Sequence, residues 1–217
     1  MRVIEVKGQI FDTSGNQFTK SLQSFPFKIW QKDSFVIEEV RVIRMVSNLN
    51  KTETEFVLDR YRFNDLRKRQ VYEYLHFSDT AKSIKKYSLD GEIKVIGSWN
   101  FQNKRRFDYK GKPENLPDTT IDGIKYQRLR LNIDKIKNVF LVDCFFQCDR
   151  NENFFTLDAE LSKTIGCPLV KVFSYSPMKN DQPSSNELKF LADTLNDEEL
   201  KVFAAWEKYA RDHPVSK

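Results

Sequence analysis

Hydrophobic and polar residues alternate along most of the chain up to Tyr175, and this alternation predicts a series of β-strands. Side chains of a strand point alternately to the two faces of its sheet, so each such segment is expected to bury one face. The predicted strands span Arg2–Phe11, Phe25–Trp30, Phe35–Val46, Glu55–Phe63, Val71–Phe77, Glu92–Phe101, Ile124–Ile133, Val139–Cys148, Phe154–Leu161 and Leu169–Tyr175. The run Val139–Phe146 is nearly all apolar, which indicates a central strand buried on both faces.

Helical patterns are fewer and lie in two places. Ser78 precedes a short segment, Asp79–Tyr87, for which we predict a helix because a serine side chain can accept the free amides of a first turn. After Ser176 the composition becomes rich in Pro, Ser, Asn and Asp, which is typical of a linker.

Two amphipathic helices are predicted after this linker. Ser184 with Glu187, and Asn196 with Glu199, have the spacing of capping boxes at helix N-termini. Apolar residues then recur at helical spacing along both segments; the two stripes are Leu188, Leu191, Leu195 and Leu200, Phe203, Trp206, Ala210.

These elements predict a mostly β (α+β) protein: an antiparallel barrel or two packed sheets, a short central helix and a C-terminal helical hairpin. An OB-like barrel is the specific hypothesis. The expected organisation is a β-rich body over 1–175, a linker over 176–185 and the helical hairpin over 186–213. With 40% hydrophobic residues and 18 Phe the chain can form a core, and it lacks an apolar run long enough for a membrane span.

The cysteines are sparse and odd in number: Cys144, Cys148 and Cys167. Their spacing contains no CxxC motif, which argues against a disulfide framework and against a cysteine-based zinc site. We therefore expect all three to be small buried apolar residues in a reducing compartment, the cytoplasm or the nucleus. The alternating N-terminal segment lacks the continuous apolar stretch of a secretory signal and is expected to be the first strand.

Charge is distributed unevenly along the chain. The formal net charge is +5, but residues 60–137 hold 19 basic and 10 acidic residues, a net charge of +9. A basic segment with interspersed aromatic residues favours a polyanionic partner.

The chemistry of this segment predicts a non-enzymatic protein that binds single-stranded DNA or RNA. Its cationic side chains would contact the phosphates, and its aromatic rings would stack on the bases. The candidate residues are Arg60, Arg62, Tyr72, Tyr74, Lys104, Arg105, Arg106, Tyr109, Lys110, Lys112, Tyr126, Arg128 and Arg130. The alternative is a solvated sheet face whose arginines pair with neighbouring carboxylates and whose tyrosines belong partly to the core.

An enzymatic alternative is a metal-dependent nuclease or triphosphate hydrolase. Glu5 and Lys7 share a strand face, as the metal-binding carboxylate and the lysine of such nucleases do. A second set of acidic residues could hold a divalent cation: Asp143, Asp158 and Glu160. The chain lacks the partner acids that this chemistry needs, and its two histidines suggest no nucleophilic catalysis. We assign no catalytic residue or metal ligand and expect no cofactor.

A third hypothesis is a structural subunit of a larger complex. Trp206 and Tyr209, on the last predicted helix, would be the anchors for a protein partner, because aromatic residues concentrate binding energy at interfaces. The alternative for these helices is to pack on the β-rich body.

Overall fold

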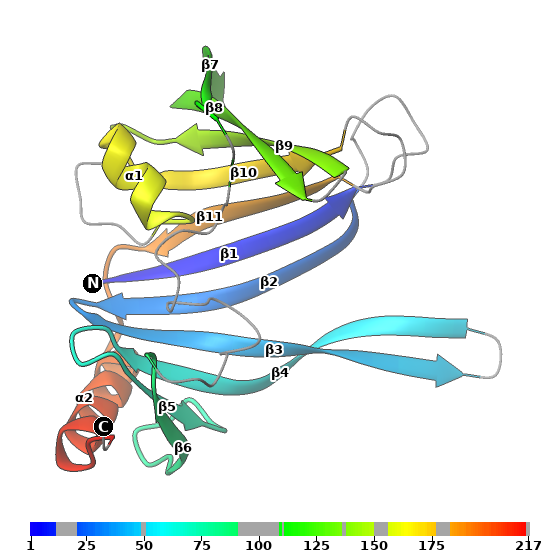
Figure 1. Ribbon diagram of the computed structural model, residues 1–217. Helices are drawn as coiled ribbons and strands as arrows, with labels where there is room; N and C mark the ends of the chain where they lie inside the picture. The colour runs from blue at the N-terminus through cyan, green and yellow to red at the C-terminus, as the bar shows by residue number, and fades with distance from the viewer. Residues whose placement is uncertain are drawn as a thin grey trace. The chain divides into compact units, whose positions relative to one another are not determined.

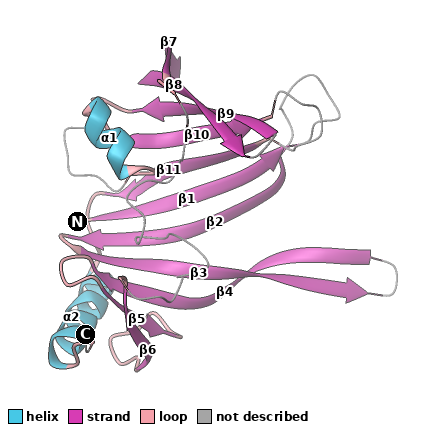
Figure 2. Ribbon diagram, in the orientation of Figure 1, coloured by secondary structure: helices cyan, strands magenta, loops and turns pink. Residues whose placement is uncertain are grey.

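The computed structural model describes residues 1–11, 21–48, 51–90, 109, 111–135, 138–149, 156–176 and 183–215. The protein is mostly β, with antiparallel strands in a sheet that is not closed (Figures 1 and 2). This confirms the predicted mostly β class. The predicted barrel is wrong, because the sheet is not closed.

The strands are β1 (Arg2–Phe11), β2 (Ser21–Lys32), β3 (Phe35–Asn48), β4 (Lys51–Asp65), β5 (Gln70–Tyr74), β6 (Ser83–Ser88), β7 (Glu114–Ile121), β8 (Ile124–Lys135), β9 (Asn138–Phe146), β10 (Leu169–Tyr175) and β11 (Ser184–Ala192). The helices in the described residues are α1 (Ala159–Ile165) and α2 (Asp197–Asp212).

The chain divides into two compact units. Unit 1 comprises Met1–Glu5, Phe27–Gln102 and Phe190–Lys217, and unit 2 comprises Val6–Pro26 and Asn103–Lys189. In unit 1 the hydrogen-bonded strand order is β6-β5-β4-β3-β2, and in unit 2 it is β11-β10-β9-β8-β7.

Unit 1 is built on the long β3–β4 hairpin, with α2 packed on one face of its strands (Figure 1). The alternation places Phe35, Ile37 and Phe63 on that face, where they meet Phe203 and Trp206 of the helix. Asn196 caps α2 in a full capping box with Glu199, and the apolar stripe of the helix is buried, as its sequence predicts.

Unit 2 has β9 as an interior strand between β8 and β10. Every residue from Val142 to Phe146 is buried, which confirms the expected central strand. The helix α1 precedes β10 and buries Leu161; Asp158 caps its N-terminus by accepting the Leu161 amide at 3.0 Å. The strand predicted over Phe154–Leu161 is therefore wrong in its second half, because Asp158 is an N-cap.

The prediction of a short central helix over Asp79–Tyr87 is also wrong. Residues Ser83–Ser88 form β6, which pairs antiparallel with β5 and sets Tyr87 opposite Val71. Pairing with the edge of β5 and burial of Tyr87 outweigh the local capping signal of Ser78, since tertiary contacts override weak helix propensity.

The first helix of the C-terminal hairpin is replaced by β11, so a single helix, α2, remains there. Glu187 does not complete a capping box with Ser184. It lies opposite Lys171 of β10, and the two side chains form an ion pair at 3.6 Å. A glutamate that could complete a capping box can instead pair with a lysine directly opposite it on a neighbouring strand. No helix in the described residues has the length and apolar character needed to cross a membrane.

Candidate nucleic-acid interface

Two arginines of β8 point to one face of unit 2 and share one carboxylate. Asp143 of β9 lies directly opposite Arg130 and accepts hydrogen bonds from its Nε at 2.7 Å and its Nη2 at 3.1 Å. Arg128 Nη2 lies 3.5 Å from the same carboxylate. The guanidinium side chains stay 24% and 28% exposed, while that of Asp143 is only 10% exposed, so the carboxylate lies beneath the two cations.

Aromatic rings flank both guanidinium groups. The Cζ of Arg128 lies 5.2 Å from the ring centroid of Phe145, the residue opposite it on β9, and that of Arg130 lies 5.9 Å from the ring of Tyr175 on β10. Tyr126 meets Phe145 edge to face at 6.1 Å. We call these six residues the arginine–aromatic face: Tyr126, Arg128, Arg130, Asp143, Phe145 and Tyr175. It combines partly exposed cations with three rings, of which those of Tyr126 and Phe145 are buried and that of Tyr175 is half-buried.

The hydrogen-bond donors of this face exceed its acceptors. One carboxylate serves two guanidinium groups, and Arg128 Nε is buried without a hydrogen-bond partner in the part of the chain that the structure describes. The hydrogen bond to Asp143 raises the pKa of Arg130, so this cation stays charged. Burial, followed by the charge of Asp143, raises the pKa of the Tyr175 phenol. The face therefore has more guanidinium donors than its one carboxylate can accept.

Two lysines of unit 2 have carboxylate partners nearby. Lys171 pairs with Glu187 at 3.6 Å, and Lys125 pairs with Asp118 at 3.2 Å. Glu114 of β7 lies opposite Arg130.

Arg60 and Arg62 lie in unit 1, where both form ion pairs with the buried carboxylate of Glu73. Arg62 is buried, with Nε donating to Glu73 at 3.1 Å, and Arg60 Nη1 donates to the other oxygen of Glu73 at 3.0 Å. The Tyr87 hydroxyl donates to the same carboxylate at 2.9 Å. This matches the alternative in which arginines pair with neighbouring carboxylates, and a buried Arg62 cannot reach a ligand in this conformation.

Tyr72 and Tyr74 are core residues of unit 1. Both are fully buried; Tyr74 stacks on Trp206 with ring centroids 3.8 Å apart. The Tyr72 hydroxyl lies 2.9 Å from the Gln70 side-chain oxygen and 3.2 Å from the backbone carbonyl oxygens of Ala210 and His213. Burial raises the pKa of both phenols. They are not stacking platforms for bases, because α2 covers them.

The same packing corrects the expected protein-docking anchors. Trp206 is 1% exposed and its indole N–H donates to the Ser78 carbonyl at 3.0 Å. Tyr209 is partly buried and packs edge-on against Tyr72 and Tyr74. Both residues hold α2 on its own unit, as in the alternative where the C-terminal helix covers the β-rich body.

The candidate residues between Lys104 and Lys112 fall mostly outside the described residues. Lys104, Arg105, Arg106 and Lys110 are not among them, whereas Lys112 is exposed and Tyr109 is half-buried.

The acidic residues do not form a metal centre in the described part of the chain, where no group of three potential ligands is found. Asp143 is bound by two arginines and Asp158 is the cap of α1. Glu160 lies in the first turn of α1 rather than beside Asp158 on a strand face.

Cys148 and Cys167 form a disulfide, which corrects the expectation of three reduced cysteines. The chain fold brings the end of β9 next to the segment between α1 and β10, a proximity that spacing alone does not reveal. Cys144 is the free, buried thiol, and burial raises its pKa to about 12. The cysteines therefore give no support to a reducing compartment, and the intracellular location stays a prediction.

Sequence reasoning missed Phe145 and Tyr175 as neighbours of Arg128 and Arg130. Phe145 and Tyr175 lie on strands whose extents were predicted well. What was missing was the register, since Arg130↔Asp143 and Arg128↔Phe145 follow from the pairing of β8 with β9.

No model of a known protein family matches the chain, and no curated protein matches its sequence. Among solved structures, a LolA superfamily protein, NE2245 from Nitrosomonas europaea, is similar, with a TM-score of 0.23 and 12% sequence identity. That alignment covers 89% of this chain and 87% of the other. A TM-score in this range does not establish a shared fold.

Proposed function

We propose that the protein binds single-stranded nucleic acid through the arginine–aromatic face of unit 2, without catalysing a reaction. The observation that supports this most is the sharing of one buried carboxylate by two partly exposed arginines set among rings. Phosphate oxygens accept hydrogen bonds from guanidinium groups in a planar, often bidentate geometry.

In this mode of binding Asp143 orients the arginines and does not contact the ligand. Its bonds engage Nε and Nη2 of Arg130 and Nη2 of Arg128, and in this mode Nη1 of each guanidinium donates to a phosphate oxygen. The half-buried ring of Tyr175, beside Arg130, offers a surface on which a base can stack. Such stacking contributes about 1–3 kcal/mol per base in single-strand binders and tolerates any sequence.

The salt dependence of binding tests this proposal. With two arginines as the phosphate contacts, the logarithm of the association constant for a labelled single-stranded oligonucleotide should fall with the logarithm of salt concentration with a slope of about −1.4, since each contact contributes roughly 0.7. Fluorescence anisotropy titrations across a series of salt concentrations give this slope. Absence of binding at about 50 mM salt would contradict the proposal, because electrostatic contacts are strong there.

A further inference from the structure

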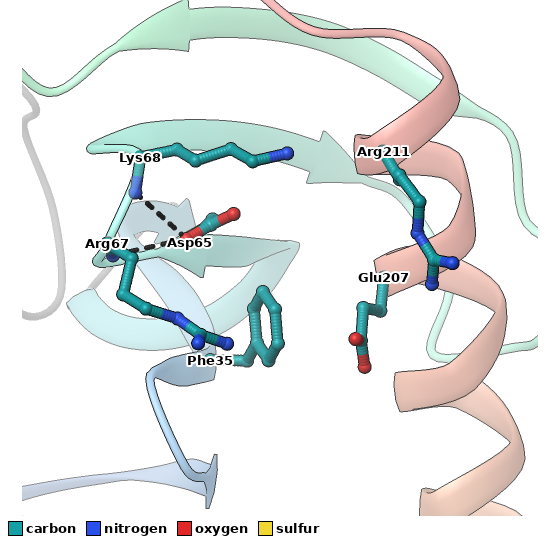
Figure 3. Close-up of a pocket in the computed structure, with 6 residues that line it drawn as sticks. All are labelled: Phe35, Asp65, Arg67, Lys68, Glu207 and Arg211. Atoms are coloured by element: carbon teal, nitrogen blue, oxygen red, sulfur yellow. Dashed lines mark hydrogen bonds between the residues drawn. The ribbon is translucent and has the colours of Figure 1, made fainter.

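A second group of cations converges in unit 1, at the turn between β4 and β5. Asp65 Oδ1 accepts the backbone amides of Arg67 at 3.1 Å and Lys68 at 3.0 Å, which ties the turn down. Arg69 completes the turn at a φ of 52°, in the left-handed region. The side chains of Arg67 and Lys68 thereby extend toward α2 (Figure 3).

The helix supplies the opposite wall. Glu207 and Arg211 lie one turn apart on α2, and together with Phe35, Asp65, Arg67 and Lys68 they line a cavity of about 350 Å³ (Figure 3). Phe35 is buried and stacks on Phe63 with centroids 5.4 Å apart, while the Arg67 guanidinium lies 5.5 Å over its ring. The floor of the cavity is therefore rigid and apolar, and its rim is charged.

The charges of the rim are unbalanced. Within the described residues, no carboxylate forms an ion pair with Arg67, Lys68 or Arg211. Asp65 is buried and its Oδ1 is engaged by the turn, and Glu207 is paired with Lys32 at 3.4 Å. The three cations outnumber the two carboxylates of the lining, and this excess of positive charge favours a bound anion.

We propose that this cavity binds a phosphate group, either as inorganic phosphate or as the terminal phosphate of a small phosphomonoester. A phosphate dianion offers oxygen acceptors to guanidinium groups from two sides, Arg67 on the turn and Arg211 on the helix, with Lys68 as a third point charge. The cavity is large enough for such a group with a small organic part. This site uses other residues than the nucleic-acid interface and does not depend on it.

Isothermal titration calorimetry of the full chain with inorganic phosphate, a nucleoside 5′-monophosphate and the matching nucleoside tests the proposal. At least one of the two phosphate compounds should bind saturably and the nucleoside should not. If only the nucleotide binds, the source is a phosphomonoester; if inorganic phosphate binds as well, the phosphate itself is recognised. Binding of the nucleoside as tight as that of its monophosphate, or no saturable binding by either phosphate compound, would overturn the proposal.

Variants make the assignment specific. Lys68→Ala and Arg211→Ala should each weaken phosphate binding about tenfold, the loss of one charge-assisted contact. Glu207→Gln should strengthen it several-fold, a gain that misfolding cannot produce. Lys208→Ala removes an exposed cation of the same helix that does not line the cavity, and should leave binding unchanged. Equal affinities for wild type, Arg211→Ala and Glu207→Gln would refute the site, whatever the result for oligonucleotides.

Discussion

Glu73→Gln is expected to lower the free energy of unfolding by about 3–5 kcal/mol, the usual cost of removing one partner from a buried ion pair. Glu73 is 2% exposed and accepts hydrogen bonds from Arg60, Arg62 and Tyr87. The amide cannot balance the buried guanidinium of Arg62 and leaves it as an uncompensated charge. Urea unfolding at neutral pH measures the loss, and Glu198→Gln, an exposed change of the same kind, should alter stability little.

The same carboxylate gives stability a dependence on pH. Burial alone would raise the pKa of Glu73, but hydrogen bonds from Arg62 and Tyr87 and the charges of both arginines outweigh it and leave the pKa below its ordinary value. A pKa depressed by folding stabilises the protein above the unfolded-state pKa, and that stabilisation is lost as the pH falls through the folded-state value. The stability of Glu73→Gln should therefore fall less on acidification than that of wild type. A parallel fall in both would contradict this account of the network.

Trp206→Ala should also destabilise the protein by about 3–5 kcal/mol, because it leaves a large cavity between α2 and the sheet of unit 1. Trp206 stacks on Tyr74, meets Phe63 edge to face at 6.3 Å and donates to the Ser78 carbonyl. Thermal or urea unfolding of the variant measures the effect. Leu191→Ala truncates a side chain that is 43% exposed, so it should cost far less. Comparable losses in the two variants would show that α2 is not packed as described.

The strands were predictable where one face is buried, because alternation is then enforced along the whole segment. Arg2–Phe11 and Leu169–Tyr175 were predicted with the bounds of β1 and β10. The helix α2 was predictable because its capping box and apolar stripe agree. The helix predicted where Ser184–Ala192 forms a strand was wrong, because Glu187, which suggested a capping box, is instead the cross-strand partner of Lys171.

Only the residue types of the candidate site were predictable from the sequence; which side chains lie next to one another was not. Arg62 and Arg128 look alike in sequence, each two residues from another arginine on a strand, yet one is buried on Glu73 and the other remains partly exposed beside Asp143. What separates them is the pairing of each strand with its neighbours, and that pairing joins residues 11 to 15 positions apart. The disulfide escaped prediction for the same reason, since its cysteines are 19 residues apart.

The most direct test of the nucleic-acid interface is oligonucleotide binding by Arg128→Gln. This change removes a guanidinium whose bond to Asp143 is the longest, 3.5 Å, and Arg130 still satisfies that carboxylate, so the fold should be retained. We expect the affinity for a single-stranded oligonucleotide to fall about tenfold, the loss of one charged phosphate contact. Lys163→Gln removes an exposed cation of α1, outside the arginine–aromatic face, and should bind as wild type does. An Arg128→Gln protein that is folded and binds as tightly as wild type would contradict the assignment of this face.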